Sequence, residues 1–489
     1  MSRLPLRQHL NAAASRLANA RFASSSAVRG LHGSGAVAGC PAKHCNNGFR
    51  VQTEDDSLWA NEEPVWKPWQ SAESPGYAPL QLGEGLVGQY AQYKVIRKLN
   101  WGVESSIWLV ERVASEHKAL KPGKLLAAKV LTAHATELEI GKSTCQIPLL
   151  NEILKHSTPP SKPDEPVNKE KFYIPGSEFT ITMFDWGAHR TRIGVHVFTI
   201  LAPMSTTLRK VQRAFRTMDP NRDVMLVRRV VKQMLFALSC VHQLGYIHGD
   251  VKADNICVPL FAEFIPDLKG YLETAPAESL PPRVFPDYSP DPVTCVKSQP
   301  YPPIGDDHHV DKIYINLVDF SSAIHASSYS TTQRAMPRML RAPEVILGHR
   351  WGQPIDIWAL GCLAAELLLH RPLFDPGDNE DDATDSEHLA QMVEVLGPFS
   401  QGALAKCPLT NTFFNTNGSL NSADGGRRVH VPSLRHSLAE VGLAGSTLDE
   451  VDALLHRMLA LDPDSRPIAS ELLNDPFVKG LNLETNTLL

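Results

Sequence analysis

The stretch His248–Asn255 reads HGDVKADN, and the strand-like stretch Ile315–Phe320 further along the chain reads INLVDF. Together they carry the polar groups that phosphoryl transfer requires: a carboxylate for the attacking hydroxyl, a lysine for the transferred phosphate, and an asparagine and an aspartate for magnesium. A polar loop that only caps the preceding helix would explain the first stretch by itself, because short polar octapeptides recur by chance. The two stretches in one chain therefore predict a site for phosphoryl transfer from ATP.

Four side chains in these stretches have separate predicted roles. Asp250 is the candidate base that orients the substrate hydroxyl, and Lys252 is placed to neutralise the transferred γ-phosphate. Asn255 and Asp319 are the expected ligands of Mg²⁺. Ser321 stands where a glycine would leave the backbone free, so it restricts the segment after Asp319.

The phosphates of the nucleotide are expected between a turn and a lysine. The turn Asn100–Ser105 lies between two strand-like runs; a full glycine-rich loop would have glycine at its first, third and sixth positions, and only the third is glycine. Lys129 lies in the apolar run LLAAKVL, where a charge is costly unless it is paired. A plain hairpin turn and an edge lysine that reaches solvent are the alternatives. The predicted phosphate contacts are Asn100, Gly102, Ser105 and Lys129.

A buried lysine requires a carboxylate partner, and the sequence leaves the choice open among Glu137, Glu139 and Glu152. Residues 139–153 contain an EI element twice, as though residues 141–153 were inserted, and without them the first two glutamates would supply the partner. Pro148 can open a helix whose middle carries Glu152. Glu152 is therefore the preferred partner of Lys129.

The order of the elements predicts the fold class. The chain has 489 residues, 43% of them hydrophobic, which is enough for a large core. Strand-like runs precede helical periodicity, which predicts an α+β, two-lobed fold with a β-rich N-lobe and an α-helical C-lobe. The predicted strands are 93–99, 106–110, 125–131 and 195–201, and helices are expected around 224–241, 355–369, 388–396 and 448–459.

Composition suggests where the segments begin and end. They are a basic Ser- and Ala-rich segment 1–53, a linker 54–92, the N-lobe and hinge 93–204, the C-lobe 205–478 and a tail 479–489. A Pro-rich insert, 259–311, is expected to loop out of the C-lobe, and an acidic insert occupies 375–396.

Composition excludes little else. The net charge of −5 is too near neutrality to indicate a partner, no apolar run is long enough to span a membrane, and the eight cysteines lack the spacing of a zinc site or a disulfide framework. Residues 1–53 contain no Asp or Glu and place arginines among Ala, Ser and Leu. This is typical of a mitochondrial transit peptide, and the alternative is a disordered basic tail.

Two further motifs are expected to anchor the substrate-binding segment. They are Arg341–Glu344, which reads RAPE, and Asp356–Trp358, which reads DIW. Arg466 is spaced to form a buried ion pair with Glu344, and such a pair is costly to break from one side. These are structural roles and not catalytic ones.

With these residues in place, residues 93–478 resemble the eukaryotic protein kinase family, and within it the SR-protein-specific kinases of fungi. Four features carry the resemblance: the loop WGVESSIWLV (101–110), the small residue Gly249 before Asp250, a spacer after Asn255, and FDPGDNEDDATDSEHLAQMVEVLG (374–397). The resemblance implies a serine/threonine kinase that uses ATP and Mg²⁺ and phosphorylates Arg/Ser-rich proteins without activation-loop phosphorylation. It also implies a monomer of the cytoplasm and nucleus, with no direct nucleic-acid or membrane partner.

The same resemblance implies the protein kinase fold, with a hinge between its two lobes. In this hinge, backbone groups of Ile200, Leu201 and Pro203 are expected to meet adenine, with Ile200 as the gatekeeper.

The resemblance also implies an acidic docking groove in residues 374–397. A run of carboxylates can attract an Arg-rich peptide by charge, with strong salt dependence, and the alternative is a solvated acidic loop. The expected docking residues are Asp375, Asp378, Glu380, Asp381 and Asp382.

Two other functions remain open on the sequence. A catalytically inactive scaffold with a kinase fold is suggested by the single glycine of the loop, the insertion after Glu139, and Ser321. A kinase for other substrates inside mitochondria is suggested by residues 1–53. Retention of Lys129, Asp250, Asn255 and Asp319 favours an active kinase.

Overall fold

The computed structural model describes residues 75–115, 122–141, 144–157, 173–214, 219–260, 265–282, 292–301, 312–328, 335–377, 379–421 and 432–483. Contacts divide the chain into two units, 1–49 and 50–489, and every described residue belongs to the second. The predictions made for residues 1–53 lie outside the described residues.

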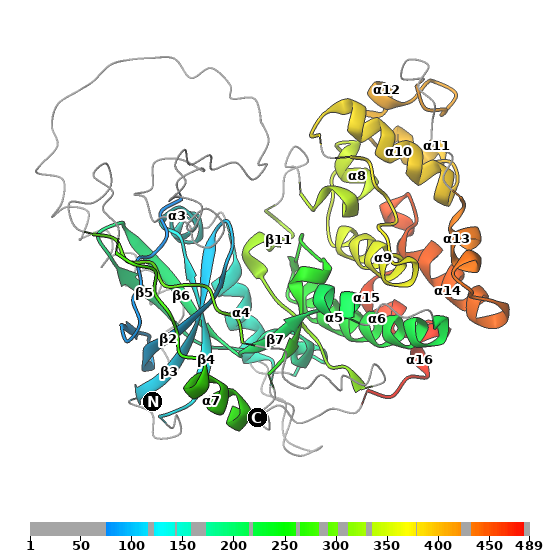
Figure 1. The fold of residues 1–489 in the computed structure, drawn as a ribbon. Helices are drawn as coiled ribbons and strands as arrows, with labels where there is room; N and C mark the ends of the chain where they lie inside the picture. Colours follow the sequence, from blue (N-terminus) through cyan, green and yellow to red (C-terminus); the bar gives the residue numbers. More distant parts are fainter. Residues whose placement is uncertain are drawn as a thin grey trace, which may run out of the picture. The chain divides into compact units, whose positions relative to one another are not determined.

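A six-stranded antiparallel sheet forms the N-lobe (Figure 1). Its order is β1-β2-β3-β4-β6-β5. The strands are β1 (Gly85–Val87), β2 (Ala91–Trp101), β3 (Ser105–Ser115), β4 (Leu125–Leu131), β5 (Met183–Arg190) and β6 (Val195–Leu201). The four predicted strands are confirmed, whereas β1 and β5 were not predicted.

The central strand β4 explains why its sequence is continuously apolar. All seven of its residues are buried. Strands β3 and β6 pair with its two edges, and apolar clusters cover its faces, with Leu126 and Val130 in one cluster and Leu125 in the other. Helix α3 (Ala133–Ile140) contacts β6, and helix α4 (Gln146–Lys155) contacts β5 and the long C-lobe helix α6 (Pro220–Gln243). The sheet thus fixes the place of α4, which borders the site.

Helices form the C-lobe around α6 and α9 (Pro354–Leu369), which contact each other. Asp219 caps α6 by accepting a hydrogen bond from Asn221 N, and Pro220 opens the helix. The other C-lobe helices are α5 (Leu208–Ala214), α8 (Pro343–Ile346), α10 (Asp382–Leu396), α11 (Gln401–Ala405), α12 (Thr410–Phe413), α13 (Leu434–Glu440), α14 (Gly445–Met458), α15 (Ala469–Leu472) and α16 (Pro476–Lys479). The helices predicted in this half of the chain are confirmed.

Short strands carry the catalytic segments. One small sheet has the order β10-β9-β7, and a second pairs β11 with β8. Their bounds are β7 (Met204–Thr207), β8 (Tyr246–Ile247), β9 (Ile256–Pro259), β10 (Asn316–Leu317) and β11 (Ile324–His325). Because β9 pairs with β10, the end of HGDVKADN lies beside the beginning of the segment that carries Asp319.

The Pro-rich insert does not loop out, and this prediction was wrong for its described part. Helix α7 (Ile265–Thr274) buries Leu268 in a cluster with Leu99 and Leu109 of the sheet. Residues 292–301 continue along the sheet, where Gln299 N donates to Lys98 O over 2.8 Å. Apolar burial therefore outweighs the local preference of a proline-rich segment for a loop.

The linker prediction for 54–92 was also wrong where the structure describes it. Tyr77, Leu80 and Leu86 are each less than a tenth exposed, and residues 85–87 form β1. The N-lobe therefore begins at least as early as residue 75. Within the described part of the chain, no helix is both long and apolar enough to span a bilayer.

Candidate active site

Lys129 and Asp319 form an ion pair between the sheet and the segment after β10. Lys129 is 6% exposed on β4, in register with Ile107 of β3 and Thr199 of β6. Its Nζ donates to Asp319 Oδ1 over 2.6 Å and to Gln146 Oε1 over 2.9 Å. The partly exposed Asp319 side chain provides the ion pair that a buried ammonium group requires.

The prediction that Glu152 pairs with Lys129 was wrong. Helix α4 begins at Gln146, which is 3% exposed, and this glutamine occupies the place assigned to Glu152. Glu152 lies six residues later and so about 240° further around the helix, where it pairs with Lys155 over 2.6 Å. Glu139 Oε1 accepts from Ile147 N over 2.9 Å, so this glutamate holds the first turn of α4.

We expect Gln146→Glu to raise kcat/KM for ATP. In the described part of the chain Asp319 is the carboxylate within ion-pair distance of Lys129, so the two groups that should bind phosphate and metal neutralise each other. A glutamate at 146 would add a second negative charge beside the ammonium and compete with Asp319 for it, and the expected gain of about three- to tenfold corresponds to an ion pair of about 1 kcal/mol. The measurement is initial-rate kinetics at varied ATP; Gln146→Leu should show the opposite change, and equal kinetics for all three proteins would contradict the argument.

Asp250, Lys252 and Asn255 form a hydrogen-bonded group. Asp250 Oδ2 accepts from Lys252 Nζ over 2.7 Å and from Asn255 Nδ2 over 2.7 Å, and Asn255 Nδ2 also donates to Asp250 O over 2.9 Å. Both hydrogen bonds of the Asn255 amide use its nitrogen, which leaves Oδ1 available as a metal ligand. Val318 N donates to Asn255 O over 2.9 Å and joins this loop to the segment of Asp319.

Asp319 is held in an unusual backbone conformation. Its φ of 59° lies in the left-handed region, and its Oδ1 accepts from Ser321 N over 3.3 Å and Ser321 Oγ over 2.8 Å. Burial by itself would raise the pKa of Asp319, but the Lys129 ammonium and the Ser321 hydrogen bonds hold this pKa well below its ordinary value. Phe320 is buried against the His248 ring, with centroids 4.9 Å apart. The carboxylate is therefore ionised and fixed in direction.

Asp356 anchors the catalytic loop, whereas the sequence predicted that it would anchor the substrate-binding segment. Its carboxylate accepts from His248 N and Gly249 N, each over 2.8 Å, and lies 2.9 Å from His242 Nε2. Burial would raise the pKa of Asp356, but His242 and His248 lower it below its ordinary value. Gly249 has a φ of 75°, which a residue with a side chain adopts only under strain. The backbone before Asp250 thus favours glycine.

The turn predicted to cover the phosphates is a tight one. The pairing of β2 with β3 ends at Asn100 and Trp101, opposite Ile107 and Ser106, and Gly102 N donates to Ser105 O over 2.8 Å where β3 begins. The Gly102 and Val103 carbonyls accept from Tyr77 OH, over 2.7 and 3.1 Å. Tyr77 was not among the residues predicted for the site, and the only signal in the sequence was the close spacing of the apolar residues Tyr77, Ala78 and Leu80.

The predicted hinge residues lie between β6 and β7. Ile200 is fully buried in the sheet core, and Leu201 is 8% exposed. Pro203 has no N–H, and its carbonyl accepts from Leu260 N over 2.9 Å. Tyr301 OH donates to Met204 O, so the insert also contacts this strand.

In the acidic segment 375–396, some carboxylates form ion pairs or hydrogen bonds within the protein, and others are exposed. Glu380 pairs with Arg338 over 2.8 Å and with Arg341 over 3.1 Å, so its charge is already neutralised. Asp381 accepts from Thr384 N and caps α10. Asp375 and Asp382 are exposed, while Asp378 lies outside the described residues.

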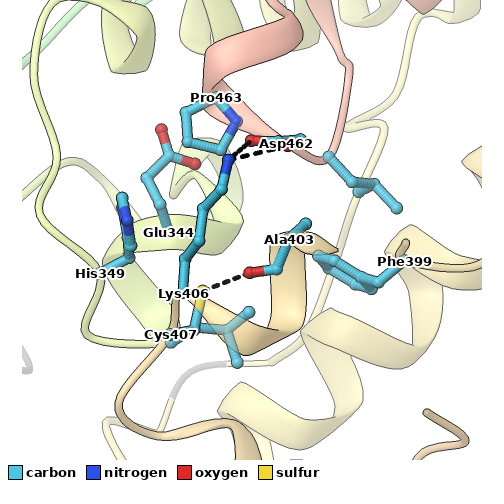
Figure 2. Close-up of a pocket in the computed structure, with 10 residues that line it drawn as sticks. Glu344, His349, Phe399, Ala403, Lys406, Cys407, Asp462 and Pro463 are labelled. Atoms are coloured by element: carbon cyan, nitrogen blue, oxygen red, sulfur yellow. Dashed lines mark hydrogen bonds and ion pairs between the residues drawn. The ribbon is translucent and has the colours of Figure 1, made fainter. Parts of the chain in front are cut away.

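The predicted pair between Glu344 and Arg466 is confirmed. Arg466 Nη1 and Nη2 donate to the two Glu344 oxygens over 2.6 and 2.7 Å, and both side chains are 1% exposed or less. A small pocket adjoins Glu344 between α8, α11 and residues 461–463 (Figure 2). Lys406 and Asp462 also line this pocket and form an ion pair, which Figure 2 marks with a dashed line.

Comparison with known proteins agrees with this architecture. The family model for the protein kinase domain matches residues 306–478, which include Asp319 and Glu344. A serine/threonine protein kinase of Aspergillus fumigatus is 26% identical over 412 residues, covering 82% of this chain and 87% of that protein. The serine/threonine-protein kinase SRPK of Physarum polycephalum is 25% identical over 422 residues, covering 82% and 89%. SRSF protein kinase 3 of mouse is 31% identical over 176 residues, covering 35% and 30%.

The fold, the catalytic group and these matches define the class: the chain contains a protein kinase domain and is a serine/threonine protein kinase that uses ATP as the phosphate donor. Within the family it is similar to the SRPK-type kinases of fungi and other eukaryotes. No finding supports the alternative of a catalytically inactive scaffold.

Proposed function

We propose that this kinase transfers the γ-phosphate of ATP to serine or threonine in Arg/Ser-rich proteins. The observation that carries the catalytic part is the pair of hydrogen-bonded groups, Lys129 with Asp319 and Asp250 with Lys252 and Asn255. The substrate class rests on the similarity to SRPK-type kinases and on the exposed acids of the α10 segment.

The residues divide the chemistry between them. Asp250 orients the attacking hydroxyl and accepts its proton, while Lys252 balances charge on the phosphoryl group during transfer. Lys129 binds the α- and β-phosphates from the sheet, and the turn at Gly102 covers them with backbone N–H groups. Catalysis by this group consists of positioning and charge stabilisation.

The oxygen donors suit Mg²⁺. Asn255 Oδ1 and Asp319 Oδ2 accept no hydrogen bond in the described part of the chain, and Mg²⁺ prefers such hard oxygen ligands beside substrate phosphates. When bound, the ion neutralises charge on the phosphates. The low pKa of Asp319 keeps this ligand ionised at neutral pH.

For the substrate, exposed carboxylates on α10 and just before it supply the docking charge. Asp375 is fixed by two bonds between its backbone and the Gln391 side chain, and Asp382 lies in the first turn of α10. Their charges are available to an arginine-rich peptide, whereas that of Glu380 is not, because Arg338 and Arg341 neutralise it.

We expect phosphorylation of an Arg/Ser-repeat peptide that weakens about tenfold between 0.05 and 0.5 M salt, since charge–charge attraction at a surface is screened. The double variant Asp375→Asn, Asp382→Asn should raise KM for the peptide about fivefold and leave kcat within twofold, because the acids act on binding. Asp381 is left unchanged, because its removal would uncap α10.

The matched control is Glu440→Gln with Asp449→Asn, which removes the same charge from exposed positions on α13 and α14. Its kinetics should equal those of the unmodified protein. Equal KM values for both double variants would refute docking at α10, and no incorporation into the repeat peptide or a general basic protein would refute the proposed activity.

We infer that the protein resides in the cytoplasm and nucleus, because it resembles SRPK-type kinases. Accumulation of a fluorescent fusion of the full chain in mitochondria would contradict this inference.

We also infer that the protein is a monomer. A dimer in analytical ultracentrifugation would contradict this second inference.

A further inference from the structure

The segment that precedes β1 crosses the N-lobe beside the phosphate-covering turn. Ala133 N donates to Gly76 O over 2.8 Å and His134 N donates to Pro75 O over 3.1 Å, which fix this segment at the start of α3. Tyr77 follows directly and is 8% exposed. Its ring is therefore held by structure that lies outside the turn.

The Tyr77 hydroxyl points at the turn. It donates to Gly102 O over 2.7 Å and lies 3.1 Å from Val103 O, so one proton is shared between two adjacent carbonyls. The Tyr77 ring also meets the Trp101 ring edge-on, with centroids 6.1 Å apart and an interplanar angle of 86°. The turn is thus restrained on its backbone and on one side chain.

The Pro-rich insert completes the support. Leu280, Val293 and Cys295 of the insert form a buried cluster with Tyr77. Gln81 Nε2, four residues after Tyr77, donates to Thr294 O over 2.9 Å. A segment that leaves the C-lobe therefore packs against the residue that holds the turn of the N-lobe.

We propose that Tyr77 is a positioning residue of the nucleotide site, which holds the turn at Gly102 in the conformation that covers the phosphates of ATP. This inference rests on the proposed function of that turn. Ordering this turn on nucleotide binding costs conformational entropy, even though only one of its three key positions is glycine. A turn that is already ordered loses less entropy on binding, which favours a lower Kd of ATP. Burial raises the pKa of Tyr77 to about 12, so the hydroxyl remains a donor throughout the physiological pH range.

The test is Tyr77→Phe, which removes the hydroxyl and keeps the ring in its cluster. We expect the Kd of ATP, measured by calorimetry, to rise about fivefold, the size expected for a shared hydrogen bond. The Kd of adenosine, which has no phosphates, should stay within the error of the measurement. Amide hydrogen exchange of the peptide 99–106 should become faster, and the thermal midpoint should be unchanged.

The matched control is Tyr314→Phe, which removes a buried hydroxyl that donates to Glu178 O over 2.8 Å in another part of the molecule. It should leave the Kd of ATP and the exchange of 99–106 unchanged. Unchanged ATP binding in Tyr77→Phe, or an equal loss for adenosine and ATP, would overturn the inference. Because binding needs no turnover, absence of phosphorylation by the unmodified protein would count against the proposed function and not against this role of Tyr77.

Discussion

Replacing Asp250 with alanine is expected to lower kcat by about 10³-fold and to leave the Kd of ATP within about twofold, because a positioned base contributes about 10²–10⁴-fold to proton transfer. Asp250 Oδ2 is bonded to Lys252 Nζ and to Asn255 Nδ2, whereas the predicted phosphate contact Lys129 is bonded to Asp319 and Gln146. The substitution thus removes the base without touching the lysine that binds nucleotide. Single-turnover phosphorylation and calorimetric ATP binding measure the two quantities separately.

The control for this prediction is Asp254→Ala in the same loop. Asp254 is about half exposed and pairs with Arg209 over 2.6 Å, so its loss removes a carboxylate that has no role in transfer. Activity of Asp254→Ala should be close to that of the unmodified protein. Turnover retained by Asp250→Ala would mean that another group accepts the proton, and the assignment of Asp250 would be wrong.

Sequence periodicity predicted the helices and strands whose apolar residues follow a regular pattern along the chain. The run LLAAKVL predicted β4 with its observed bounds, because burial on both faces requires a continuous apolar sequence. The strand β5 was missed because Asp185 interrupts it; this buried carboxylate accepts from Gln89 N and Tyr93 OH, and no local pattern reveals such distant donors.

Tertiary packing determines the features that the sequence left open or predicted wrongly. The partner of Lys129 depends on how α4 rests against β5 and α6, and this contact brings the first residue of the helix to the lysine in place of the seventh. Similarly, the proline content of 259–311 indicated a loop, but Val293 and Val296 are 1% and 2% exposed against the N-lobe. The catalytic group itself was predictable, since Asp250, Lys252 and Asn255 are held together by bonds within one short loop.

We expect Arg466→Met to lower the free energy of unfolding by about 3–5 kcal/mol, because it leaves a buried charge without its partner. Glu344 would keep a carboxylate that is 1% exposed and lose both of its guanidinium bonds. Glu344→Gln should be less damaging, since the Arg466 guanidinium still donates to Ala460 O over 2.7 Å and to Pro354 O over 3.1 Å. Urea unfolding followed by tryptophan fluorescence measures each change.

The double variant Glu344→Leu, Arg466→Met separates a lost charge from lost packing. If the buried charge is the main cause, the double variant should be more stable than Arg466→Met, because an apolar pair carries no desolvation penalty. If it is equally unstable, the loss comes from the packing of the guanidinium against Trp358, whose ring centroid lies 4.9 Å from Arg466 Cζ. Arg435→Met, which breaks an exposed pair with Asp449, should leave the unfolding transition unchanged and so controls for the removal of an arginine.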